Sequence, residues 1–218
     1  MDIRAKIKGL YSICDVSFST QYSPAELARL LLKGGAPLLQ LRMKGEKDLK
    51  KVKEAAQAIL QEKKKFSFTF LINDFVEVAR ELPVDGVHLG KDDLPLDQAR
   101  ALLGNEKIIG YSSHSLEEAL EAEQAGADYV AFGAIFPTKT KGPGHPVQGL
   151  ERLSRVVNAV KIPVVAIGGI TKENIDSVLE TGVAAVAMIT ALTQAPDVAE
   201  AVRWFVEKMK WSEKKSNP

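Results

Sequence analysis

The sequence predicts a single-domain α/β fold, the (β/α)8 or TIM barrel, over residues 1–210, followed by a flexible tail over residues 211–218. Three observations predict it. Short apolar runs alternate with longer amphipathic stretches along the chain and make eight strand-then-helix units. The runs are rich in Val, Ile, Leu and Phe without clean alternation, which is typical of parallel strands buried on both faces. Polar residues follow the runs, where a barrel of this kind carries its active site.

The eight apolar runs are the expected strands. They span Leu10–Cys14, Pro37–Leu41, Thr69–Ile72, Gly86–Leu89, Lys107–Gly110, Tyr129–Phe132, Pro163–Ile167 and Ala184–Ile189. The runner-up fold is an open doubly wound sheet. No G-x-G-x-x-G motif follows the first run, which counts against the dinucleotide-binding version of that fold.

The stretches between the runs carry helix start and stop signals. In residues 23–35, Ser23 stands at the cap position, Pro24 lies just inside the helix, and glycines end it. Ser115 opens a second helix of this kind, with an acidic first turn. The helices marked by their pattern are residues 23–35, 46–65, a short one at 75–82, then 115–127, 171–182 and 195–210.

Composition excludes several classes of protein. The chain has 29 Lys and Arg against 28 Asp and Glu, a net charge of +1 that argues against a general nucleic-acid binder. The single cysteine, Cys14, makes no internal disulfide and suits a reducing cytoplasm. The start shows no signal peptide, and no apolar run reaches the roughly 18 residues of a membrane span. We therefore expect a cytoplasmic protein without nucleic-acid or membrane partners; a homo-oligomer stays open.

Two groups of residues suit anion binding. Gly168–Gly169 after the seventh run lets the backbone approach a ligand, and N–H groups there and near Ile189–Thr190 suit a phosphate; a tight turn is the alternative. After the sixth run, PTKTK supplies two hydroxyls and two ammonium groups, which suit an anion. The alternative interpretation is a solvated loop without a binding function. Its polar surroundings disfavour a Schiff-base lysine, which needs a desolvated pocket. These four residues are Thr138, Lys139, Thr140 and Lys141.

The stretch LINDFV, residues 71–76, ends an apolar run in an amide and a carboxylate, which are costly to bury. Asp74 there and Asp93 in HLGKDDLP follow adjacent runs, so in a barrel they converge. Such a pair suits Mg²⁺, which keeps waters and borrows phosphate oxygens. The alternative to a metal site is a turn or a helix cap, in which Asn and Asp are common. The spacing of His88, His114 and His145 disfavours a zinc site. Cations that would surround the same anion are Arg42, Lys44 and Lys141.

At these residues the chain resembles the thiamine phosphate synthase family. The matching segments are LYSICD, QLRMK, LINDFVEVA, VHLGKDDLP, IIGYSSHSLEEA, ADYVAFGAIFPTKTK, PVVAIGGIT and VAMITAL, in order along nearly the entire chain. The resemblance implies a Mg²⁺-assisted transferase on a (β/α)8 barrel. Its reaction joins 4-amino-5-hydroxymethyl-2-methylpyrimidine diphosphate to 4-methyl-5-(2-phosphoethyl)thiazole, giving thiamine phosphate and diphosphate.

The resemblance also implies a role for each matching residue. Gln40 would contact the pyrimidine, and Ser112 would meet the leaving group and the reacting centre. Asp74 and Asp93 would ligate Mg²⁺. The diphosphate would be held by Arg42, Lys44, Asn73 and Lys141. The thiazole phosphate would be held by Thr138, Thr140, Gly169, Ile189 and Thr190. The catalytic side chains would be Ser112, Lys141 and Arg42.

Three features depart from the family's usual pattern: Lys91, Phe75 and the GPGHP segment after Lys141. They leave two alternatives open. A related group, the thiazole tautomerases, uses a histidine where His114 stands, and a non-catalytic barrel would keep only the thiazole phosphate site. The retained diphosphate and metal residues favour the synthase.

Overall fold

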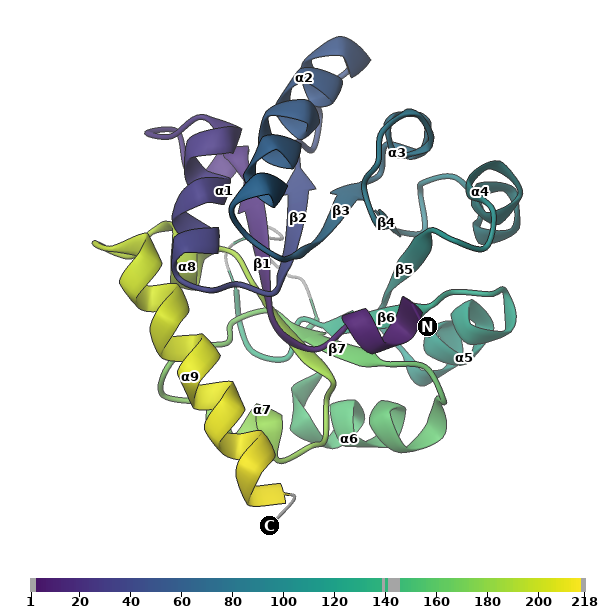
Figure 1. The fold of residues 1–218 in the computed structure, drawn as a ribbon. Helices are drawn as coiled ribbons and strands as arrows, with labels where there is room; N and C mark the ends of the chain where they lie inside the picture. Colours follow the sequence, from purple (N-terminus) through teal and green to yellow (C-terminus); the bar gives the residue numbers. More distant parts are fainter. Residues whose placement is uncertain (1–2, 139, 141–145, 217–218) are drawn as a thin grey trace.

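Eight parallel strands close into a barrel in the computed structural model, which describes residues 3–138, 140 and 146–216 (Figure 1). Each strand pairs with the next in the chain, and β8 pairs with β1, so the prediction of a (β/α)8 barrel is confirmed. The strands are β1 Gly9–Asp15, β2 Leu38–Arg42, β3 Thr69–Asn73, β4 Gly86–Leu89, β5 Ile108–Ser113, β6 Tyr129–Gly133, β7 Val164–Ile167 and β8 Ala185–Met188.

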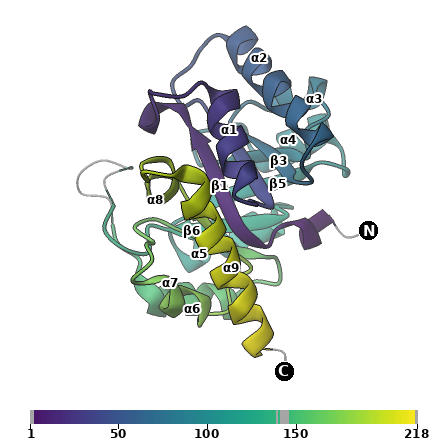
Figure 2. The ribbon, with the colours of Figure 1, turned by 60° about the vertical axis from the view of Figure 1, so that its left-hand side comes forward.

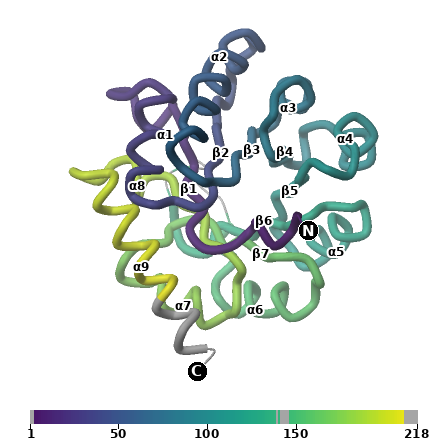
Figure 3. Tube along the Cα trace, viewed as in Figure 1, coloured from purple at the N-terminus to yellow at the C-terminus, as the bar shows by residue number. Residues whose placement is uncertain are grey.

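Helices surround the barrel on its outside (Figure 3). The α-helices are α1 Pro24–Lys33, α2 Leu49–Leu60, α3 Val76–Glu81, α4 Leu96–Leu103, α5 Leu116–Gln124, α6 Gly149–Ala159, α7 Ile175–Leu179, α8 Thr190–Thr193 and α9 Val198–Ser216. In the described residues, the short 3-10 helices are η1 Ile3–Lys6, η2 Val16–Phe18 and η3 Gln61–Lys64. Helix α9 packs on α1 and β1, so the last helix covers the first strand (Figure 2). Within the described part of the chain, no helix is long and apolar enough to cross a membrane.

The helix signals in the sequence act as predicted. Ser23 and Glu26 form a reciprocal capping box at the start of α1, and Pro24 is its first residue. Ser115 Oγ accepts the Glu118 N–H at 3.1 Å and so caps α5. Helix α3 is short, as expected near residues 75–82. Helix α9 continues through residues 211–216, so the chain is helical for longer than the sequence indicated; flexibility of residues 211–218 stays a prediction.

Two apolar layers hold the strands. Side chains between the sheet and the helices make the outer layer, while a smaller cluster fills the barrel interior. The interior cluster includes Ile7, Tyr11, Leu38, Leu71, Ile108, Tyr129 and Val165. Because these side chains are almost completely buried, the middle of the barrel is a packed core, and a ligand would bind at an end of the barrel.

Five strands end beyond the apolar runs that predicted them: β6 by Gly133 and the other four by polar residues, the first of which is Asp15 at the end of β1. Arg42 ends β2, Asn73 ends β3, and β5 continues through Ser112 to Ser113. The reason is cross-strand pairing: Ser112 and Ser113 lie opposite Ala131 and Phe132 of β6, so backbone hydrogen bonds extend past the last apolar residue. These polar residues are therefore held on strands rather than on loops.

Two aspartates tie the strands together at the opposite, amino-terminal end of the barrel. Asp85 accepts the Phe70 N–H at 2.9 Å, and Asp128 accepts the Ile109 N–H at 2.8 Å. Each carboxylate thus satisfies a backbone donor of the preceding strand. Burial alone would raise the pKa of Asp85, but its hydrogen bonds hold the pKa below the usual value. The two carboxylates also pair with Lys6, Lys63 and Arg100.

We predict that Asp128→Ala lowers the free energy of unfolding by about 1–3 kcal/mol, because it leaves the buried Ile109 N–H without its acceptor. Urea unfolding at neutral pH, with an unchanged m-value, measures the loss. Glu151→Ala is the matched control, since the Glu151 side chain is 80% exposed and pairs with Arg155 across one helical turn. It should change stability by less than about 0.5 kcal/mol. Equal effects of both substitutions would contradict the assignment.

Candidate active site

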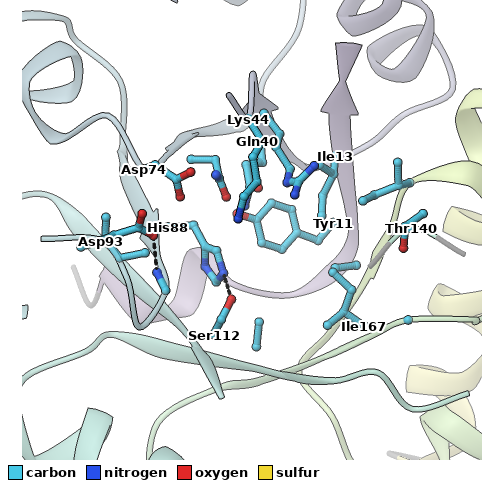
Figure 4. A pocket seen from close by; sticks show the side chains of 18 of the residues that line it. Tyr11, Ile13, Gln40, Lys44, Asp74, His88, Asp93, Ser112, Thr140 and Ile167 are labelled. Carbon is cyan, nitrogen blue, oxygen red and sulfur yellow. Dashed lines mark hydrogen bonds between the residues drawn. The ribbon is translucent and has the colours of Figure 1, made fainter. Parts of the chain in front are cut away.

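A cavity of about 520 Å³ opens at the carboxyl ends of the strands (Figure 4). Most of the sequence-predicted site residues line it: Gln40, Arg42, Lys44, Asn73, Asp74, Asp93, Ser112, Thr138, Thr140 and Ile189. Gly169 and Thr190 do not line it, but they directly follow the lining residues Gly168 and Ile189. Lys141 and His145 lie outside the described residues. Residues far apart in the sequence thus meet in one concave space.

Asp74 and Asp93 approach each other at one side of this cavity (Figure 4). Asp74 follows β3 in a left-handed backbone conformation, with φ 67°, and its N–H donates to the His88 carbonyl at 3.0 Å. Asp93 Oδ2 accepts the Gly90 N–H at 2.7 Å. Burial, followed by the hydrogen bond and negative charge of Asp93, raises the pKa of Asp74 to about 7; Lys44 and Arg42 oppose this rise. Two carboxylates so placed ionise together only at a cost, which a divalent cation between them would remove.

Mg²⁺ and Zn²⁺ need different ligands, and the cavity offers those of Mg²⁺. Asp74, directly after β3, and Asp93, in the loop after β4, both line the cavity, and their carboxylate oxygens fit Mg²⁺, which needs few protein ligands and keeps waters. His88 and His114 also line the cavity. Among the described residues, however, no three His, Cys, Asp or Glu side chains form a group able to hold a metal. The donor set therefore suits a hard cation that takes its remaining ligands from water or substrate.

Arg42 is held in place by an acid that sequence analysis missed. Asp15 ends β1 directly opposite Arg42 on β2, and the two form an ion pair. Asp15 is fully buried and also accepts the Ser17 N–H at 3.0 Å. The pair positions the Arg42 guanidinium at the cavity wall. The signal in the sequence was LYSICD, where a carboxylate closes an apolar run as in LINDFV.

A hydrogen-bonded chain of polar side chains forms one side of the cavity and continues into the barrel beneath it. Gln40 Nε2 donates to Tyr11 Oη at 2.6 Å, and Tyr11 Oη lies 2.9 Å from Tyr129 Oη. His88 Nδ1 lies 2.8 Å from Tyr129 Oη, and His88 Nε2 lies 2.9 Å from Ser112 Oγ. Sequence analysis selected Gln40 and Ser112 but not the two tyrosines, because in the sequence they resemble ordinary core residues.

The other side of the cavity is apolar with two hydroxyls. Thr138 Oγ1 and Thr140 Oγ1 lie 2.9 Å apart, Thr140 and Ile167 lie on the side away from Asp74 and Asp93 (Figure 4), and Ile13 and Ile189 also line the cavity. Gly168 and Gly169 have φ 102° and 67°, and a Cβ on Gly169 would come within 2.5 Å of the Pro137 carbonyl oxygen. The turn and its packing against the loop after β6 therefore require glycine here, whether or not a phosphate binds.

His114, the residue on which the tautomerase alternative depends, also lines the cavity. Its backbone N–H donates to Glu118 Oε2 at 2.7 Å, and its Nδ1 lies 3.3 Å from the same oxygen. The ring is thus oriented by the first turn of α5.

Comparison with known proteins agrees with this geometry. A family model described as thiamine monophosphate synthase matches residues 10–192. The chain is 44% identical to a thiamine-phosphate synthase of Syntrophomonas wolfei over 89% of this chain and 92% of that protein. It is 43% identical to the thiamine-phosphate synthase of Pyrococcus furiosus over 96% and 99% of the two chains.

A solved structure agrees as well. The thiamine phosphate pyrophosphorylase from Pyrococcus furiosus superposes with a TM-score of 0.83 and 41% identity, covering 95% of this chain and 98% of that chain. The residues that the family model matches, 10–192, include the carboxylate pair, Arg42, Lys44 and the glycine turn. This chain belongs to the thiamine monophosphate synthase family.

Proposed function

We propose that the protein is a thiamine phosphate synthase, a transferase that couples the pyrimidine diphosphate to the thiazole phosphate. One observation carries the proposal. An acidic pair and two cations, Asp74, Asp93, Arg42 and Lys44, meet at one side of a cavity whose other side offers Thr138, Thr140 and the glycine turn. That arrangement suits two phosphorylated substrates with their reacting ends between them.

The first substrate would lie along β2–β5. Gln40 would contact the pyrimidine, and Ser112 the bond that breaks. Its diphosphate would be bound by Arg42, Lys44, Asn73 and Lys141. The thiazole phosphate would be bound across the cavity by Thr138, Thr140, Gly169, Ile189 and Thr190. Both sets of residues follow from the family resemblance. Ten residues of the predicted site, counting Asp74 and Asp93, line the cavity, which supports their assignment.

Asp74 and Asp93 would hold Mg²⁺, for which their proximity and the raised pKa of Asp74 make a fitting pair. When bound there, Mg²⁺ would neutralise charge on the leaving diphosphate. The protein's own cations would act on the same charge, because Arg42, fixed by Asp15, and Lys44 face the same anion.

The reaction then needs little else from the chain. The C–O bond to the diphosphate breaks and its electron pair leaves with the diphosphate, while the pyrimidine amino group stabilises the cation left behind. The thiazole nitrogen donates its lone pair to that carbon and forms the new C–N bond. No side-chain nucleophile is needed. The isoleucines that line the cavity would limit the access of water, which would otherwise capture the cation.

Two alternatives keep the same fold. A thiazole tautomerase would use His114 to move a proton, and the position of His114 in the cavity wall supports it. A non-catalytic barrel would bind the thiazole phosphate alone. Neither gives a role to the carboxylate pair, which is why we favour the synthase. Cytoplasmic location and homo-oligomerisation stay predictions.

The purified protein, given both substrates and Mg²⁺, should form thiamine phosphate, detected as fluorescent thiochrome. EDTA should abolish the product. Arg42→Gln should reduce the rate of product formation by at least about 100-fold, because it removes a charge-assisted contact to the leaving group. Arg155→Gln, on the exposed face of α6, is the control and should leave the rate unchanged. A protein that binds thiazole phosphate but makes no product would contradict the synthase assignment.

Asp74→Asn tests the proposed metal site through protein stability, without a measurement of catalysis. The pKa of Asp74 is raised in the folded protein, so ionising it costs stability as pH rises from about 4 to about 7. At pH 8 in EDTA, the variant should therefore melt at a higher temperature than the wild type, and at pH 4 the difference should vanish. Asparagine also tolerates the backbone conformation at this position.

Added Mg²⁺ should raise the melting temperature of the wild type at pH 8 but not that of Asp74→Asn. Differential scanning calorimetry measures both effects without any substrate. Equal Mg²⁺ shifts in the two proteins, or none in the wild type, would be evidence against the carboxylate pair as the metal site.

His114→Asn distinguishes the tautomerase alternative. If the protein is a synthase, the variant should keep the rate of thiamine phosphate formation within about threefold, because the proposed reaction assigns no proton transfer to His114. A tautomerase would lose its activity completely with the same change. Kinetics of thiamine phosphate formation and of thiazole phosphate isomerisation, measured on one preparation, give the answer.

A further inference from the structure

Tyr129 is a polar residue of the barrel interior that the proposed function does not use. It lies on β6, is completely buried, and is not part of the cavity wall. Its hydroxyl contacts Tyr11 Oη at 2.9 Å and His88 Nδ1 at 2.8 Å, and its ring stacks on the His88 ring with centroids 5.5 Å apart. A buried phenol that packs for shape alone needs no such pair of polar partners.

We propose that Tyr129 is a positioning residue. Its hydroxyl fixes the proton of His88 on Nε2, so that His88 donates to Ser112 Oγ and the Ser112 proton is directed into the cavity, toward the leaving diphosphate. The proposal rests on the proposed function for the identity of that ligand. The arrangement of protons within the chain can be tested independently of it.

Donor counting gives the direction of the chain. The Gln40 amide nitrogen carries only donors, so Tyr11 Oη accepts from it. Among the contacts of the described residues, Tyr129 Oη is the acceptor within reach of the buried Tyr11 proton. Tyr129 then donates its own proton to His88 Nδ1. The reverse order would leave the Tyr11 proton without an acceptor among these contacts, which is costly in a buried site.

The direction determines what Ser112 offers to a ligand. With Nδ1 accepting from Tyr129, a neutral His88 carries its proton on Nε2 and donates it to Ser112 Oγ, 2.9 Å away. The Ser112 hydroxyl then keeps its proton for the cavity, where an anionic diphosphate needs donors. In the reverse direction, the serine would donate its proton to His88 and would present only lone pairs to the anion.

Burial keeps both phenols protonated, as the chain requires. Loss of solvent raises the pKa of Tyr11 and the pKa of Tyr129 well above the usual tyrosine value. The two hydroxyls are therefore donors at any pH at which the enzyme would work.

The hydrogen-bonded series needs space inside the barrel at residue 110. In the register of β4, β5 and β6, Gly110 lies between His88 and Tyr129, paired with both. A Cβ on Gly110 would come within 2.0 Å of the Tyr129 ring and 2.4 Å of its hydroxyl oxygen. Because residue 110 has no side chain, Tyr129 and His88 meet across β5. Gly110 lies two residues before Ser112 on the same strand, so both face the interior.

Tyr129→Phe tests the proposal, because it keeps the ring and its packing and removes only the hydroxyl. We expect the single-turnover rate of thiamine phosphate formation to fall by about 10-fold to 100-fold, while KM for thiazole phosphate stays within about twofold. The decisive comparison is a double-mutant cycle. In a Ser112→Ala background, Tyr129→Phe should have almost no further effect, since Tyr129 acts through Ser112.

Tyr111→Phe is the matched control. Tyr111 is adjacent to Ser112 on β5 and packs on the outer core. It is not part of the hydrogen-bonded series from Gln40 to Ser112, so its hydroxyl should be dispensable. A wild-type rate in Tyr129→Phe would overturn the proposal. So would an equal loss in the wild-type and Ser112→Ala backgrounds, because that pattern indicates a general structural effect.

Nitrogen-15 NMR of the histidine rings tests the proton arrangement without substrate. The chain has three histidines, and a His88→Gln variant assigns the signals of His88. We expect an unprotonated Nδ1 and a protonated Nε2 in the wild type, and a mixture of tautomers in Tyr129→Phe. A proton on Nδ1 in the wild type would overturn the proposal. If the wild type made no thiamine phosphate, the proposed function would fail while this measurement still decided the tautomer.

Discussion

The parallel pairing of β1 with β8 is the contact on which the rest of the site depends. It joins Gly9–Ser12 to Ala185–Met188 and closes the sheet, so the carboxyl ends of all eight strands meet around one opening. Interior side chains fill the barrel below that opening and leave the cavity at its upper end. An open sheet of the same strands would place Asp15 of β1 and Ile189 after β8 at opposite edges. Closure makes them parts of one end of the barrel.

Charge at the opening is arranged in two contrasting ways. Asp15 is buried and paired with Arg42, so this carboxylate is neutralised within the protein and serves to fix a cation. Asp74 and Asp93 face each other, and burial, followed by the hydrogen bond and negative charge of Asp93, raises the pKa of Asp74 more than Lys44 and Arg42 lower it. The first arrangement fixes the Arg42 guanidinium at the cavity wall. The second leaves two carboxylates whose charge an external cation would compensate.

The polar chain from Gln40 to Ser112 shows how a packed barrel carries a functional group deep in its core. Each hydroxyl or ring nitrogen finds a partner on an adjacent strand or across the barrel interior, so burial costs little. Thr140 and Ile167 lie on the side of the cavity away from Asp74 and Asp93 (Figure 4), and Ile13 and Ile189 also line it. The cavity therefore has a charged side and a less polar side. That division suits a reaction in which charge separates on one substrate and is captured by the other.

The sequence by itself determined the fold and much of the candidate site. Apolar runs, helix caps and the polar residues that follow the runs are local signals. Given these signals, the known topology of a barrel is enough to predict that Asp74 and Asp93 lie close together. Only the tertiary structure decided what holds these residues in place. Tyr11 and Tyr129 are 118 positions apart and His88 and Tyr129 are 41 apart, so no local pattern distinguishes them from core aromatics. The same is true of Asp15, whose role depends on the register that places it opposite Arg42, because pairing between strands is set by packing of the whole barrel.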